Sequence, residues 1–111
     1  DLSVEIYRLT ESFPKSELYV LISQIRRASV SIPANIAEGH QRDTTKDYLR
    51  FLSMSRGSLA EVETLLLIST RLRYVEMAQA KPLLTSLDSL SRMIKNHQRS
   101  LRRKIDDRET P

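Results

Sequence analysis

The chain has 111 residues, a net charge of +4, a pI near 9.7 and no cysteine. This length suits one domain with a single core, and the lack of cysteine excludes disulfides and thiolate metal sites and fits a reducing cytosol. No apolar run reaches the roughly 18 residues of a membrane span, and no signal-peptide pattern is present. We therefore expect a cytoplasmic protein, with residues missing before Asp1 because the chain does not start with Met.

Two segments with helical periodicity open the chain, which is poor in glycine and rich in Leu, Ile, Ser, Arg and Ala. Apolar residues at spacings of three and four predict a helix over about 1–12, which Pro14 ends. The same spacing, from Leu18 to Ile36, predicts a second helix over about 16–38. Pro33 falls inside this pattern, so we expect a kink there and a left-handed cap at Gly39.

Two longer helices are predicted to follow, over about 44–73 and 76–104, the first capped by Asp43 or Thr44. Beside the apolar face of the 44–73 helix runs a second stripe, which is either an oligomer interface or the edge of a wide core: Leu49, Ala60 and Leu67. The polar tail, residues 106–111, is expected to fray. Short links make neighbouring helices antiparallel, so residues 1–105 are predicted to form an all-α, up-down-up-down four-helix bundle.

Two runs of sequence carry a resemblance to a known family. Residues 24–39 read QIRRASVSIPANIAEG and residues 56–63 read RGSLAEVE, with Phe13-Pro14 placed before Glu17. Over essentially the whole chain they resemble the bacterial four-helix-bundle family of 23S ribosomal RNA intervening-sequence proteins. The resemblance implies a homopentamer with a basic surface but no established molecular role. The distantly similar accessory proteins of diversity-generating retroelements bind nucleic acid and a reverse transcriptase.

The polar residues of the first run have structural or binding interpretations. Arg26 and Arg27 point about 100° apart, so at least one reaches solvent or a partner, through either a surface ion pair or nucleic acid. Small polar residues around Pro33 are expected to satisfy backbone groups freed by the kink, or else to form a polar groove: Ser29, Ser31 and Asn35.

Three further residues are predicted to have structural roles. Glu38 lies at the negative end of a helix dipole and needs a cationic partner, for which Arg42 and Arg56 are the candidates. Gly57 lies in the middle of a helix, where glycine costs about 1 kcal/mol relative to alanine. We expect the close approach of another helix there to compensate.

A basic segment near the C-terminus is the best nucleic-acid feature. It contains Arg92, Lys95, Arg99, Arg102, Arg103 and Lys104 with no acid among them, and most of these fall at spacings of three and four. They are predicted to bind RNA or DNA phosphates together with Arg26, Arg27 and Arg42. A solvated helix face is the alternative interpretation. Plausible stacking aromatics are limited to Tyr19, Tyr48 and Tyr74, which disfavours sequence-specific reading of RNA.

No enzymatic chemistry is evident in the sequence. The histidines, His40 and His97, lie far apart and form no Glu-x-x-His pair, and no catalytic triad or glycine-rich phosphate loop can be assembled. We expect no cofactor, no metal and no membrane partner. Two hypotheses remain: a basic homo-oligomer, with a pentamer favoured, that binds nucleic acid, and a structural or interaction bundle with an acidic protein partner.

Overall fold

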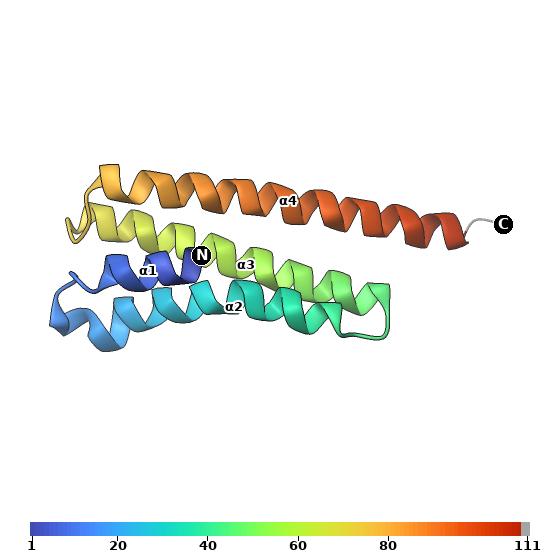
Figure 1. Cartoon of the computed structure of the whole chain (residues 1–111), viewed down its shortest axis with the longest axis horizontal. Helices are drawn as coiled ribbons and strands as arrows, with labels where there is room; N and C mark the ends of the chain where they lie inside the picture. The colour runs from blue at the N-terminus through green and yellow to red at the C-terminus, as the bar shows by residue number, and fades with distance from the viewer. Residues whose placement is uncertain (110–111) are drawn as a thin grey trace.

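Four α-helices form the protein in a computed structural model, which describes residues 1–109 (Figure 1). They are α1 (Leu2–Thr10), α2 (Ser23–His40), α3 (Thr45–Arg71) and α4 (Met77–Glu109). Between α1 and α2 lie a 3₁₀ turn, η1 (Lys15–Glu17), and a π-helical turn, η2 (Leu18–Ile22). The predicted all-α four-helix bundle is confirmed. The chain reverses direction at each connection, and the molecule measures 59 × 24 × 19 Å (Figure 1).

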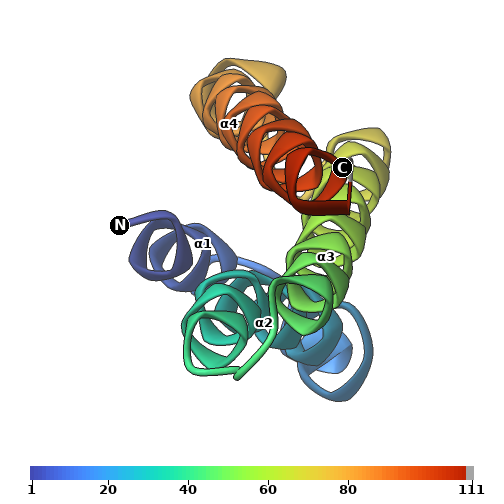
Figure 2. The ribbon, with the colours of Figure 1, turned by 90° about the vertical axis from the view of Figure 1, so that its right-hand side faces the viewer.

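The core lies along the contact of α2 with α3; α1 packs beside α2 and α4 packs beside α3, and both lie on the same side of this pair (Figure 2). Its fully buried apolar side chains come from all four helices: Ile6, Ile25, Ile32, Leu52, Val62, Leu66 and Leu87. Each is worth about 1.5–3 kcal/mol relative to exposure, so burial dominates the stability of the bundle. Thr44 caps α3 by accepting a hydrogen bond from the Asp47 amide at 3.1 Å, as one of the two predicted caps.

The start of the second helix differs from the prediction. A helix over 16–38 would bury Leu18, but η1 and η2 occupy residues 15–22 and Leu18 is 43% exposed. A π-helical turn inserts an extra residue, which rotates the preceding side chains off the core face. Leu21 and Ile22, which belong to the same apolar pattern, are buried, while Tyr19 and Val20 face outward like Leu18.

Pro33 lies inside a continuous α2. Because proline has no amide hydrogen, it leaves the carbonyl of Ser29 without its helical donor. The Ser3 hydroxyl of α1 donates to this oxygen at 3.0 Å, so α1 supplies the bond that we had expected from the serines of α2. Asn35 instead donates to the Ser31 carbonyl at 2.9 Å, and the Ser31 hydroxyl contacts the Ser58 hydroxyl of α3. The kink at Pro33 stays a prediction.

Neither glycine has its predicted role. Gly39 is not a left-handed cap, because α2 continues to His40 and no described glycine has a positive φ. It is buried where α2 crosses α3: a Cβ on Gly39 would lie 2.6 Å from the Cβ of Phe51. Gly57, predicted to allow close helix packing, is exposed, and a Cβ there would meet nothing within 4 Å.

The two long helices end differently. After α3 the chain turns through Arg73, a non-glycine residue at φ 63°, and the Tyr74 amide bonds back to the Ser69 carbonyl at 3.0 Å. Helix α4 continues to Glu109, five residues beyond the predicted end at 104; the fraying of the polar tail stays a prediction, and residues 110–111 lie outside the described part. None of the helices described within residues 1–109 combines the length and the hydropathy that a membrane span requires.

Candidate functional site

Helix α4 carries a stripe of exposed cations along one side, which we call the basic stripe: Arg92, Lys95, Arg99, Arg102 and Arg103. Arg92 is bound by Asp88 at 3.0 Å. The other members make no ion pair or hydrogen bond with residues 1–109. Lys104 is also exposed but lies about 100° around the helix from Arg103, outside the stripe. The stripe is therefore a row of solvated cations open to an anionic partner.

The other predicted nucleic-acid residues have different surroundings. Arg42 pairs with Glu38 at 2.9 Å and Asp47 at 3.7 Å, and its guanidinium lies 4.6 Å from the ring centroid of Phe51. The expected cationic partner of Glu38 is thus Arg42, and Arg42 is held by protein contacts. Arg27 is exposed and has no partner in the described part of the chain.

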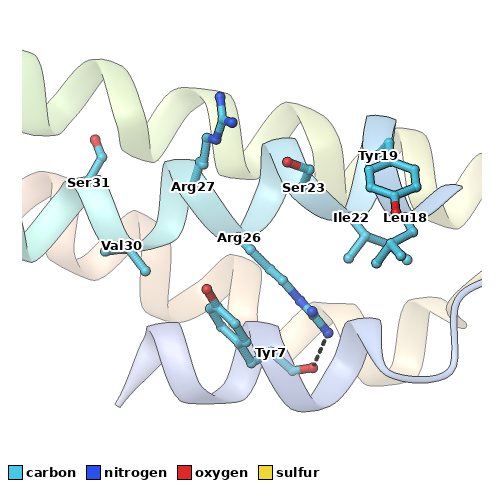
Figure 3. A pocket seen from close by; sticks show the side chains of 9 residues that line it. All are labelled: Tyr7, Leu18, Tyr19, Ile22, Ser23, Arg26, Arg27, Val30 and Ser31. Carbon is cyan, nitrogen blue, oxygen red and sulfur yellow. Dashed lines mark hydrogen bonds between the residues drawn. The ribbon is translucent and has the colours of Figure 1, made fainter.

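Arg26 lies across the contact between α1 and α2 (Figure 3). Its Nε donates to the Thr10 hydroxyl at 2.9 Å, its Nη2 donates to the Tyr7 carbonyl at 3.3 Å, and its guanidinium lies 4.6 Å from the Tyr7 ring centroid. No ion pair of Arg26 is present among residues 1–109, so the expected surface ion pair is not the role of this side chain. Arg26 therefore has a structural role, because its side chain holds α2 against α1.

Around Arg26 is an open groove of about 590 Å³ on the outer side of α1, η2 and α2, which we call the α1–α2 groove (Figure 3). Its lining includes four exposed apolar or aromatic side chains, Tyr7, Leu18, Tyr19 and Val30, above the buried Ile22. Tyr19 is 88% exposed, and Arg27, which also lines the groove, extends from α2 away from α1 (Figure 3). Sequence periodicity missed this feature because the π-helical turn creates it.

The predicted interface stripe lies on the flank of α3 next to α4. Leu49 is half-buried, Ala60 is exposed, and Leu67 is 40% exposed. The buried Gln98 of α4 contacts the Leu49 carbonyl at 3.4 Å, so one end of the stripe is covered within the chain. A contact between copies at this stripe stays a prediction.

The remaining aromatic and histidine residues form local clusters. Both histidines lie against Tyr48: the Nε2 atom of His97 is 3.1 Å from its hydroxyl, and the His40 ring packs edge-on to its ring. Tyr74 packs on Phe13 and donates a hydrogen bond to Glu17. Desolvation, then the charge of Glu17 and this hydrogen bond, raise the pKa of Tyr74 above 10.0. Among residues 1–109, no group of three or more His, Cys, Asp or Glu side chains is placed to hold a metal.

Comparisons with known proteins identify relatives by sequence and by fold. The sequence model of the family described as "23S rRNA-intervening sequence protein" matches residues 1–96. A comparison with the curated proteins finds no match. Among solved structures, a protein of unknown function from the S23 ribosomal protein family of Bacteroides thetaiotaomicron is similar, with a TM-score of 0.77 and 22% identity. The similarity covers 86% of this chain and 87% of that one, and at this identity it bears on the fold.

Proposed function

We propose that this chain, which belongs to the family of 23S rRNA-intervening sequence proteins, is a non-enzymatic, homo-oligomeric bundle that binds RNA or DNA. Binding takes place through phosphate contacts and without base-specific reading. The observation that supports this most is the basic stripe of α4, where Lys95, Arg99, Arg102 and Arg103 are exposed and unpaired in the described part.

The spacing of the stripe suits a polyanion. From Lys95 to Arg103 a helix advances about 12 Å, over which duplex DNA carries on the order of seven phosphate charges. The stripe therefore meets several phosphates at once. Few aromatic side chains accompany it, so stacking on unpaired bases contributes little and a duplex is the preferred ligand.

Assembly into an oligomer would multiply these contacts. A homopentamer, which the family resemblance implies, would present the stripe five times and raise the avidity without any new contact within a subunit. The flank of α3 with Leu49, Ala60 and Leu67 is the proposed contact between copies. Light scattering that finds only a monomer of about 13 kDa at micromolar concentration would remove this part of the proposal.

The test is duplex binding measured against salt. The triple variant Arg99→Ala, Arg102→Ala, Arg103→Ala is compared with Arg8→Ala, Arg71→Ala, Lys81→Ala, which removes the same charge from exposed sites elsewhere. Each lost phosphate contact reduces the steepness of the slope of log K against log salt by about 0.9. The slope of the first variant should therefore be shallower by up to about 3, and the slope of the control should be almost unchanged. Equal losses in both variants, or no binding by the unchanged protein at low salt, refute the proposal.

The alternative is an interaction bundle with an acidic protein partner, and the α1–α2 groove favours it. An exposed tyrosine beside aliphatic side chains and the unpaired Arg27 suits an apolar, acidic segment of a protein. A pull-down that returns the same protein with and without nuclease, and loses it with Tyr19→Ser, supports this alternative. A protein that is no longer recovered after nuclease treatment counts against the interaction with an acidic protein.

A further inference from the structure

A cavity of about 400 Å³ lies between α3 and α4 around Arg56, in the second sequence run that carried the family resemblance. Its polar lining comes from both helices, with Ser53, Arg56 and Glu63 on α3 and Ser91 and Lys95 on α4. Its volume falls in the range of small-ligand sites. The packing of the core does not account for it, and Lys95 is the one lining residue that belongs to the basic stripe.

Gln98 fixes the position of the Arg56 guanidinium. It is fully buried, and its Nε2 donates to the Ser53 hydroxyl at 2.9 Å and to the Leu49 carbonyl at 3.4 Å. With both acceptors on the nitrogen side, the amide oxygen must face Arg56, and it accepts from Nη1 at 3.1 Å. A buried side chain thus holds Arg56 by one of its terminal nitrogens.

The other edge of the guanidinium has no partner. Nε is a buried donor without an acceptor, and no carboxylate of the described residues lies within 4.0 Å of Arg56. Nε and Nη2 point in the same direction and form the fork that binds two oxygens of one anion. A buried, charged donor without an acceptor lowers stability, and an oxoanion on this edge relieves that loss.

The rest of the cavity supplies space and a second cation. Gly57 lines it, and because a Cβ there meets nothing within 4 Å, the missing side chain keeps the space open. Lys95 faces the cavity from α4 and makes no ion pair or hydrogen bond within residues 1–109. Glu63 also lines the cavity, so two cations there outnumber one carboxylate.

We propose that this cavity is a phosphate site. The Nε–Nη2 edge of Arg56 turns toward the anion and donates to two of its oxygens, while Lys95 and the Ser91 hydroxyl bind the others. A carboxylate has only two oxygens and leaves some of these donors unused, which favours a tetrahedral phosphate. The phosphate belongs either to a free small molecule or to a nucleic-acid backbone, and the site does not depend on the duplex binding proposed above.

The test follows the Arg56 Nε–Hε signal by NMR in ¹⁵N-labelled protein titrated with inorganic phosphate, with acetate or chloride at the same ionic strength, and with duplex RNA. A saturable shift with phosphate assigns the site to free phosphates. A shift with RNA alone assigns it to a backbone phosphate. No saturable shift with either overturns the proposal, as does an equal response to acetate.

Two variants separate binding from folding. Gly57→Leu fills the cavity without a clash at Cβ and replaces a helix-interior glycine, so the variant is expected to melt at a higher temperature and yet lose the shift. Lys95→Gln is expected to weaken binding at least fivefold. Lys81→Gln is the matched control, since it removes the same charge from an exposed residue of α4 that neither lines the cavity nor belongs to the basic stripe. Wild-type binding by Gly57→Leu and Lys95→Gln would refute the site.

Discussion

Replacing Gly39 with alanine tests the packing of α2 against α3. The new methyl carbon would lie 2.6 Å from the Cβ of Phe51 and 2.9 Å from Cδ1 of Tyr48, where ordinary contacts fall at 3.4–4 Å. Rotation of the tyrosine ring can relieve the second contact. The Phe51 Cβ is attached to the backbone of α3, so the first contact is relieved only if the two helices move apart.

Two opposing free energies set the size of the effect. Alanine gains about 1 kcal/mol over glycine in a helix interior. Overpacking in a core costs typically about 1–3 kcal/mol, and a clash between backbone-fixed atoms in the best-packed pair of helices lies at or above the upper end. We therefore expect Gly39→Ala to lower the free energy of unfolding by roughly 2 kcal/mol and the melting temperature by roughly 10 °C.

The change in the free energy of unfolding is measured by urea unfolding followed by circular dichroism at 222 nm. The protein concentration is kept fixed, because assembly would add to the apparent stability. Gly57→Ala is the matched control: nothing lies within 4 Å of its new methyl group, so it should gain about 0.5–1 kcal/mol. If Gly39→Ala is as stable as the unchanged protein, or if both variants shift in the same direction, the reasoning about helix approach is wrong.

Three further predictions follow from single contacts. Ser3→Ala should lower the free energy of unfolding in urea by about 1 kcal/mol, because it removes the hydrogen bond to the Ser29 carbonyl. In a Pro33→Ala background, where the backbone amide of residue 33 can bond to that carbonyl, the loss should be small. An equal loss in both backgrounds would contradict the bond between Ser3 and the Ser29 carbonyl. Arg73→Gly should gain up to about 1 kcal/mol because φ is 63°, and a loss would show that the side chain outweighs the backbone strain. The pKa of Tyr74 is raised in the folded state, so its neutral form stabilises the fold below pH 10, and this contribution is lost as the pH rises through the folded pKa. The variant Tyr74→Phe should therefore show a smaller fall in melting temperature at alkaline pH. An unchanged fall would argue against the Glu17 contact.

Local periodicity was enough to predict the four helices and the buried isoleucines. Ile25 and Ile32 are core because apolar residues at spacings of three and four form one helical face, which is a property of the chain segment itself. The π-helical turn at Leu18–Ile22 breaks that rule locally, and no turn-forming residue marks it in the sequence. The α1–α2 groove depends on this turn, so it could not be predicted from spacing.

The roles of the two glycines depend on neighbouring helices and could not be read from one helix. Both interrupt helical patterns, and only the position of Phe51 and Tyr48 distinguishes Gly39 from Gly57. Gln98, by contrast, left a usable signal, because it stands in the apolar register of α4 between Ile94 and Leu101. A polar residue at a core position needs a buried partner, and the partner proves to be Arg56 with Ser53 and the Leu49 carbonyl.

The two runs that indicate the family therefore differ in what explains them. In residues 24–39, contacts with neighbouring helices account for Ser29 and Arg26 on the α1 side and for Ser31 and Gly39 on the α3 side. In residues 56–63 the packing leaves Gly57 without a steric reason and Arg56 without an acceptor on one edge. Residues that cost stability and gain nothing from the fold are expected at binding sites. We therefore expect the ligand-binding residues of the motif in α3, and the architectural ones in α2.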